Sequence, residues 1–293
     1  MSKIPNMQIV NNNNVTNIIS QADERFNKYL ERQSMTANTS ILTGLSELDE
    51  VIGGWEYGEE LVTIVARTNQ GKSWILLKFL MEAWKQGKRV LLYSGEMSAT
   101  KLGYRFDALL QHFSNRNLVR GNDEPNYKTF IEDLKKNETP FIIVTQKDLG
   151  GRATVTKIKN LAVKYNVDII GIDQYSLMQD ERMKKGDAIR TAYANITEDL
   201  FKLSTEMQIP ILGLVQSNRE GAKSKEEQGT PELENVAESD AIVQNSSKVI
   251  SLRQTGAGLE LNIKKNREGQ VGDKLLYFWD IDKGTFTYVP STC

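Results

Sequence analysis

The sequence is poor in cysteine, histidine and proline, and these shortages exclude several classes of protein. Its 293 residues include 6 Pro, one Cys (Cys293) and one His (His112). A single cysteine cannot form an intramolecular disulfide, and one Cys with one His argues against a structural zinc site. The composition is that of an ordinary globular protein in a reducing cytosol.

An excess of one charge and long apolar runs are also missing. Lys and Arg total 37 against 38 Asp and Glu, so the formal net charge is -1 and a polyanion must be bound locally rather than by overall attraction. No segment approaches the ~20 apolar residues of a membrane span, and the N-terminal residues lack the features of a signal peptide. We therefore expect a soluble, non-secreted, cytoplasmic protein without a membrane partner.

Composition and periodicity divide the chain into three parts. Residues 1–17 are polar, include four consecutive asparagines and are expected to form a flexible tail. Residues 18–40 contain an amphipathic helix, which starts near Ser20, and a polar connector. The apolar side of this helix either packs on its own domain or lies against a neighbouring subunit. Residues 41–293 form the main body.

The main body predicts an α/β fold. Apolar strand-like runs alternate with helical segments, which is typical of a parallel sheet covered on both faces. Shorter, alternating runs near the C-terminus are joined by Gly-containing turns and predict an antiparallel extension. The first group covers residues 61–66, 89–94, 140–145, 167–173 and 209–216, and the second covers 248–254, 259–266, 274–281 and 285–289.

A phosphate-binding loop is the strongest local motif. The segment ARTNQGKS, residues 66–73, lies between the first predicted strand and a helix. Its Gly71-Lys72-Ser73 ending is that of a P-loop, in which the lysine meets the β- and γ-phosphates and the hydroxyl ligates Mg²⁺. Ala66 replaces the first glycine of the general motif. The predicted ATP-binding residues are Arg67, Thr68, Asn69, Gln70, Gly71, Lys72, Ser73 and Trp74.

Three polar residues at or just after strand ends are further candidates, because the carboxyl ends of such strands face the ligand. Glu96 is predicted to orient and deprotonate the attacking water, or else is an acidic residue near a helix start. Asp173 is predicted to hold Mg²⁺ through water, with a turn-capping role as the alternative. Gln216 is predicted to hydrogen-bond the γ-phosphate; the alternative is a buried, satisfied glutamine.

These motifs together resemble the C-terminal RecA-like motor domain of DnaB-type replicative helicases. The matching segments are TGLSELDEVIGG, VARTNQGKS, YSGEMS, IDQYSLM, LVQSNRE and KKNREGQVG, in the family's order from about Ile41 to about Phe286. In that family the first P-loop position is commonly Ala, as in Ala66. The family's N-terminal helical collar has no counterpart here, which suggests a compact, phage- or plasmid-encoded form acting in the host cytoplasm. The helix after Ser20 resembles the family's linker helix, which docks on a neighbouring subunit.

The resemblance implies an ATP- and Mg²⁺-dependent DNA helicase that forms a ring, usually a hexamer, with ATP bound between subunits. Lys265 and Arg267 match the pair that reaches the γ-phosphate of the adjacent subunit, and their alternation puts both on one side of an extended segment. The alternative for Lys265 and Arg267 is a solvated basic turn. A primase or a helicase loader is an implied protein partner.

Single-stranded DNA is the implied polymer ligand, because basic residues in a ring channel track phosphates without sequence readout. Where the family has an Arg-Glu-Ser-Gly segment, this chain has Ala237, Glu238, Ser239 and Asp240, which removes one cation from that contact. The predicted DNA-binding residues are Arg182, Lys184, Lys185, Arg190, Arg219, Lys223 and Glu238.

Two other classes of function remain open at this point. The P-loop and TGLSELDEVIGG also occur in RecA-type filament proteins and in KaiC-like rings that do not unwind DNA, whereas KKNREG favours the helicases. A non-catalytic assembly factor is the third class. The intact set of Lys72, Ser73, Glu96 and Asp173 argues against it.

Overall fold

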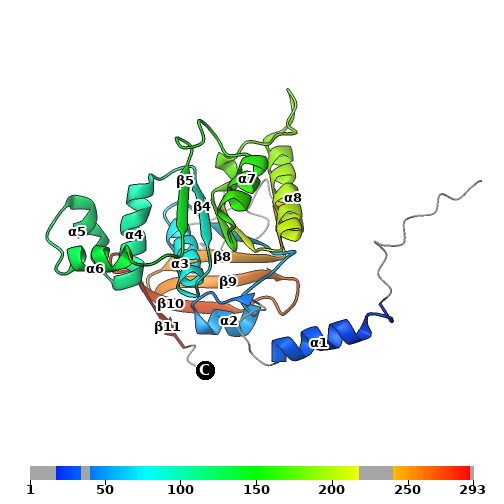
Figure 1. The fold of residues 1–293 in the computed structure, drawn as a ribbon, viewed down its shortest axis with the longest axis horizontal. Helices are drawn as coiled ribbons and strands as arrows, with labels where there is room; N and C mark the ends of the chain where they lie inside the picture. The colour runs from blue at the N-terminus through cyan, green and yellow to red at the C-terminus, as the bar shows by residue number, and fades with distance from the viewer. Residues whose placement is uncertain (1–17, 34–39, 218–239, 291–293) are drawn as a thin grey trace, which may run out of the picture. The chain divides into compact units, whose positions relative to one another are not determined.

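The computed structural model describes residues 18–33, 40–217 and 240–290 (Figure 1). The chain divides into two compact units, Met1–Thr39 and Ser40–Cys293. In the first unit, α1 (Ala22–Gln33) is stabilised by an ion pair between Lys28 and Glu24 at 3.0 Å. Its apolar side chains Phe26 and Tyr29 stack with ring centroids 6.1 Å apart and are 59% and 55% exposed.

A nine-stranded sheet forms the centre of the second unit, in the order β11-β10-β9-β8-β3-β7-β6-β4-β5. From β8 to β5 the neighbours are parallel, and from β8 to β11 they are antiparallel. The predicted parallel sheet with an antiparallel extension is therefore confirmed. The run at 248–254, expected in the extension, forms β8, which pairs parallel with β3 and antiparallel with β9. The strands are β3 (Leu61–Ala66), β4 (Val90–Ser94), β5 (Phe141–Thr145), β6 (Ile169–Asp173), β7 (Ile211–Gln216), β8 (Lys248–Thr255), β9 (Gly258–Asn266), β10 (Lys274–Asp280) and β11 (Thr285–Val289). A separate two-stranded sheet pairs β1 (Ser40–Ile41) with β2 (Trp55–Glu56).

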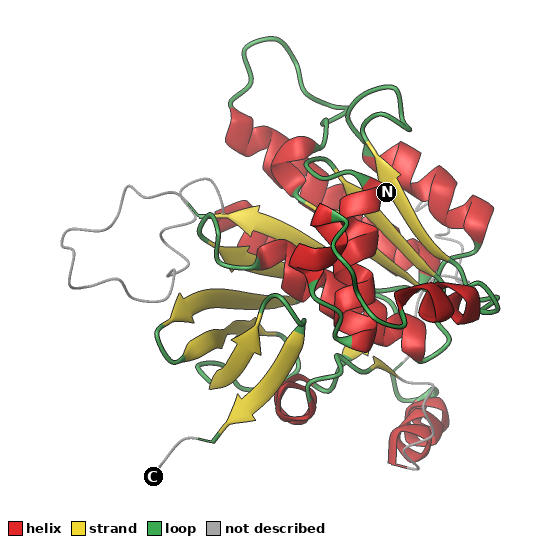
Figure 2. Ribbon diagram, turned by 90° about the vertical axis from the view of Figure 1, so that its left-hand side faces the viewer, coloured by secondary structure: helices red, strands yellow, loops and turns green. Residues whose placement is uncertain are grey.

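Helices cover both faces of the parallel part of this sheet (Figure 2). Alternation along β3 sends Val62 and Ile64 into the core shared with α3 and α4, and Leu61 and Val65 into the core shared with α7 and α8. None of the described helices is long and apolar enough to cross a membrane. The helices of this unit are α2 (Ser46–Ile52), α3 (Lys72–Lys85), α4 (Ala99–Gln111), α5 (Asn115–Arg120), α6 (Tyr127–Leu134), α7 (Val155–Tyr165), η2 (Tyr175–Leu177), α8 (Ile189–Met207) and α9 (Asp240–Asn245).

The turn between β10 and β11 is held by the start of α5. Asp282 accepts hydrogen bonds from the Ser114 hydroxyl at 2.7 Å and from the backbone N–H of Arg116 at 2.8 Å. Gly284 packs so closely on α4 that a Cβ there would lie 2.8 Å from the Cα of Leu109. The helices after β4 therefore fix the position of this turn, which reaches the site described below.

Replacing Asp107 by asparagine should stabilise the protein at neutral pH. Asp107 is buried on α4 and accepts a hydrogen bond from the Tyr127 hydroxyl of α6 at 2.8 Å. Burial raises the pKa of this carboxyl to about 6, so the folded state holds a proton that an unfolded carboxyl, with a pKa of ~3.9, has released. Stability is therefore lost as the pH rises from about 4 to about 6 and stays lower above that window.

Urea unfolding at several pH values tests this prediction. Asp107→Asn should be more stable than the parent by about 2 kcal/mol near neutral pH, and the difference should vanish near pH 4. Asp133→Asn, at an exposed residue of α6, is the matched control and should show no such pH-dependent gain. A stability difference between Asp107→Asn and the parent that is the same at every pH would contradict the raised pKa of Asp107.

Candidate functional site

The candidate site lies along the carboxyl edge of four neighbouring parallel strands. Ala66, at the end of β3, pairs with Gln216 at the end of β7, and Ser94, at the end of β4, pairs with Asp173 at the end of β6. Glu96 follows β4 in the loop before α4. Because the strand order is β3, β7, β6, β4, the P-loop and the three predicted polar residues meet at one edge of the sheet.

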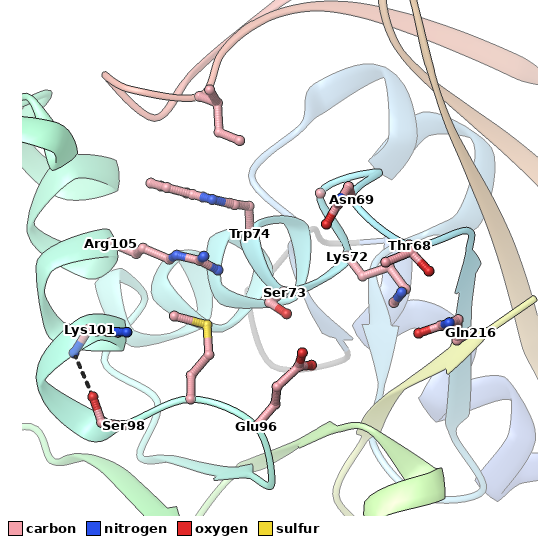
Figure 3. A pocket seen from close by; sticks show the side chains of 13 residues that line it. Thr68, Asn69, Lys72, Ser73, Trp74, Glu96, Ser98, Lys101, Arg105 and Gln216 are labelled. Carbon is pink, nitrogen blue, oxygen red and sulfur yellow. Dashed lines mark hydrogen bonds between the residues drawn. The ribbon is translucent and has the colours of Figure 1, made fainter.

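A pocket of about 760 Å³ opens at this edge (Figure 3). Its volume lies within the range of small-ligand sites, roughly 300–1,000 Å³. The P-loop, the loop after β4, α4, the end of β7 and the β10–β11 turn supply its walls. The lining residues are Thr68, Asn69, Gly71, Lys72, Ser73, Trp74, Glu96, Met97, Ser98, Lys101, Arg105, Gln216 and Ile281.

Lys72 presents an ammonium group that is suited to a phosphate. Its Nζ donates to the carbonyl oxygen of Arg67 at 3.4 Å, the only hydrogen bond to this group among the described residues. Burial lowers the pKa of Lys72, and the carboxylates of Asp173 and Glu96 oppose that shift. A half-buried cation with donors to spare is a favourable site for a polyphosphate.

Gly71 allows the close approach of the C-terminal strands to the P-loop. Its φ of 83° lies in the left-handed region, and a Cβ at this position would lie 2.3 Å from Cη2 of Trp279 on β10. Both conditions require glycine. Trp279 in turn stacks on Phe286 of β11, with ring centroids 5.7 Å apart. The antiparallel extension therefore supports the P-loop directly.

Asp173 and Ser73 have the chemistry of a magnesium site. Asp173 is 2% exposed, and its Oδ2 atom has no hydrogen-bond partner among the described residues. Burial raises its pKa, and a side-chain hydrogen bond from Ser73 partly offsets the rise. Oxygen ligands that leave room for water and phosphate are those that Mg²⁺ takes. Ser73 and Asp173 supply two oxygens, which suits an ion that takes its other ligands from water and phosphate. The part of the chain that the structure describes has no group of three or more His, Cys, Asp or Glu side chains suited to a metal.

The two residues predicted to act on a neighbouring subunit lie outside this pocket. Lys265 is the last but one residue of β9, and Arg267 begins the following turn, so only Lys265 belongs to the strand. Lys265 is half-buried and Arg267 is exposed. Neither lines the pocket of its own chain, a placement compatible with action on another subunit.

The family model described as "DnaB-like helicase C terminal domain" matches residues 40–285. The chain belongs to this DnaB-like family. It is 27% identical over 277 residues to the "Probable plasmid replicative DNA helicase" of Chlamydia psittaci, covering 91% of this chain and 59% of that protein. It is 24% identical over 295 residues to the "Replicative DNA helicase DnaB" of Mycoplasma genitalium, covering 93% and 62%. The chain thus spans about three fifths of the length of these curated relatives.

Two solved structures share the fold. One of them, described as an ATPase domain, superposes with a TM-score of 0.79 at 20% identity, covering 92% of this chain and 99% of that chain. A DnaB-like replicative helicase, whose structure was described with its interactions with primase, gives a TM-score of 0.74 at 20% identity, covering 90% and 66%. The predicted RecA-like architecture is confirmed.

Two cations in the pocket of this DnaB-like domain were not predicted from the sequence. Figure 3 shows Lys101 and Arg105 entering from α4, at the end of the pocket opposite Gln216. The guanidinium of Arg105 lies 5.0 Å from the ring centroid of Trp74. Their i,i+4 spacing puts both on one face of α4. This spacing could have indicated from the sequence that the two cations act together. Ile281, the contribution of the β10–β11 turn, had no local signal at all.

Six of the eight predicted ATP-binding residues line the pocket, and two do not. Arg67 instead offers its backbone carbonyl to Lys72. The side chain of Gln70 accepts a hydrogen bond from the backbone N–H of Gln254 on β8. In this domain these two residues therefore shape the P-loop, while Thr68, Asn69, Gly71, Lys72, Ser73 and Trp74 face the cavity.

The predicted DNA-binding residues fall into three groups. Arg182 pairs with Glu198 at 3.0 Å and Asp199 at 3.2 Å on α8, so its charge is already partly neutralised. Lys184, Lys185 and Arg190 are exposed. Arg219, Lys223 and Glu238 lie outside the described residues.

Proposed function

We propose that this protein is the motor of a ring-forming replicative DNA helicase. It couples Mg²⁺-dependent ATP hydrolysis at subunit interfaces to translocation on single-stranded DNA and duplex unwinding. The observation that carries the proposal is the meeting of a P-loop, a carboxylate after β4 and a carboxylate at the end of β6 on one sheet edge. Membership of the DnaB-like family supports it.

In this proposal ATP binds with its phosphates on the P-loop, where Lys72 contacts the β- and γ-phosphates. Glu96 accepts a proton from a water molecule whose oxygen attacks the γ-phosphorus. The bond between the γ-phosphorus and the bridging oxygen breaks, and ADP and phosphate leave. A bound Mg²⁺, held through Ser73 and Asp173, would offset the negative charge on the phosphates. Gln216 hydrogen-bonds the γ-phosphate and responds to its loss.

The ring arrangement is part of the same proposal. Lys265 and Arg267 reach the γ-phosphate in the pocket of the adjacent subunit, within the hexameric ring that is usual in the family, and Arg267 acts as an arginine finger. The helix α1 docks on a neighbouring subunit. The exposed apolar side chains of α1, Phe26 and Tyr29 among them, support that docking, because exposed apolar surface favours burial.

Single-stranded DNA is the proposed polymer ligand, and the exposed cations Lys184, Lys185 and Arg190 supply sequence-independent phosphate contacts. A primase or a helicase loader is a proposed protein partner. The proposed place of action is the cytoplasm, where such a motor meets a replication fork.

Steady-state ATP hydrolysis with and without unstructured single-stranded DNA tests the proposal, together with the particle mass in ATP and Mg²⁺. We expect strong stimulation by DNA in a ring-sized particle, and displacement of a labelled strand from a forked duplex. Hydrolysis that is indifferent to DNA, or that comes from a stable monomer, would overturn the helicase assignment. Stimulated hydrolysis without strand displacement would favour a non-unwinding RecA-type ATPase.

A further inference from the structure

Lys265 is held against the end of α9 by two backbone carbonyls. Its Nζ donates to the carbonyl oxygen of Val243 at 2.7 Å and to that of Gln244 at 3.1 Å. Carbonyls in the last turn of a helix lack intrahelical donors, so they are suited to bind an ammonium group. Burial, followed by the positive charge of Arg267, lowers the pKa of Lys265. The two cations thus repel each other while they share this edge of the molecule.

Arg267 is held against α8 by an aromatic ring. Its guanidinium carbon lies 5.2 Å from the ring centroid of Phe201, within the range of a cation–π contact. Its backbone N–H donates to the carbonyl oxygen of Ser247 at 3.0 Å. Phe201 is half-buried and packs against the core between the sheet and α7–α8. The ring therefore has a fixed position from which to orient an exposed arginine.

Asn245 joins α9, which holds Lys265, to α8, which holds Arg267. Its Nδ2 atom donates to the carbonyl oxygen of Ala194 at 3.2 Å and to the Thr197 hydroxyl at 3.0 Å. Thr197 and Phe201 are four residues apart and share one face of α8. Phe201, Asn245 and the carbonyls of Val243 and Gln244 thus form one unit, which we call the α8–α9 cradle.

We propose that Phe201 is a positioning residue for Arg267, and that the α8–α9 cradle restrains the trans-acting pair before it meets the γ-phosphate of the neighbouring subunit. This inference rests on the proposed function. A long arginine side chain loses rotamer freedom when it engages a phosphate, and a side chain already restrained loses less. Such restraint acts on the rate of the chemical step, because the finger stabilises charge that develops during phosphoryl transfer.

Mixed assemblies test this inference. Donor subunits carry Lys72→Ala and keep their Arg267, and acceptor subunits carry Arg267→Ala and keep their nucleotide pocket. Each variant alone should be inactive, and their mixture should recover hydrolysis where a donor arginine faces an acceptor pocket. Adding Phe201→Leu to the donor should lower kcat about threefold to tenfold, the effect of losing a cation–π contact, and leave KM for ATP unchanged. Phe201→Tyr in the donor keeps the aromatic face and should restore the rate.

Placing Phe201→Leu in the donor or in the acceptor separates an effect on the position of Arg267 from an effect on folding. Phe201→Leu should lower the rate only in the subunit that supplies Arg267, and Phe130→Leu, at a half-buried position of α6, is the matched control in the donor. An equal loss with Phe201→Leu in either subunit, or no loss in the donor, would overturn the inference. If the mixture of Lys72→Ala donors and Arg267→Ala acceptors, with Phe201 unchanged, does not recover hydrolysis, the trans role of Arg267 itself is overturned. If thermal unfolding shows that Phe201→Leu does not fold, Asn245→Ala in the donor gives the same test.

Discussion

Replacement of Glu96 by glutamine should leave ATP bound but lower its turnover by roughly 10²- to 10⁴-fold, the usual contribution of a general base. Glutamine has the size of glutamate and keeps its hydrogen-bonding oxygen, so the pocket retains its shape. An amide cannot accept the proton of the attacking water. The measurement is kcat for ATP hydrolysis beside a calorimetric Kd for ATP, both in the presence of Mg²⁺.

Two outcomes would contradict this assignment of the base. Turnover close to the parent value would show that the proton of the water goes elsewhere. Loss of ATP binding would show that Glu96 shapes the pocket rather than acting in catalysis. Glu132→Gln, the same change at an exposed residue of α6, is the control and should behave like the parent.

Replacement of Arg267 by alanine should lower kcat by about 10³-fold or more, the magnitude associated with an arginine finger. The affinity of the ring for ATP should stay near the parent value, because the finger stabilises charge that develops during phosphoryl transfer rather than in bound ATP. Arg267→Lys keeps the charge but loses the planar guanidinium and should recover only part of the rate. The measurement is kcat in a particle whose mass shows that the ring has formed.

The control for this variant is Arg152→Ala, at an exposed residue before α7. It removes one arginine without touching the β9 edge and should leave kcat unchanged. Arg267→Ala with the parent rate in a ring-sized particle would exclude a trans role. A variant that no longer assembles would move Arg267 from phosphoryl transfer to the subunit interface.

The sequence predicted the sheet, and the strand ends that form the candidate site, because both depend on local patterns. Apolar runs such as 61–66 predict buried strands. Asp173 and Gln216 are the last residues of two such runs, which places them at strand ends. The parallel pairing of β3 with β7 agrees with the alternation of strands and helices. The parallel pairing of β3 with β8 was not predicted, because the short run 248–254 resembles the antiparallel strands that follow it.

The contacts that complete the site could not be predicted in the same way. Trp279 meets Gly71, and Arg182 pairs with Glu198, only because of how distant segments pack. A basic run such as the one at Lys184 looks the same in sequence whether or not α8 brings carboxylates to it. Contacts of this kind depend on tertiary register, and no local periodicity records them.

A nascent chain completes this candidate site late in its synthesis. The P-loop strand β3 lies between β7 and β8 in the sheet, and Trp279 of β10 packs on Gly71. A ribosome that has already made the P-loop and Glu96 has therefore not yet made the strands that hold them in place. Because a ligand stabilises only the state that binds it, a nucleotide at this site would stabilise the finished domain but would not guide its early folding. Until β8 emerges, β3 remains an apolar segment with an unpaired edge, the kind of intermediate that chaperones protect.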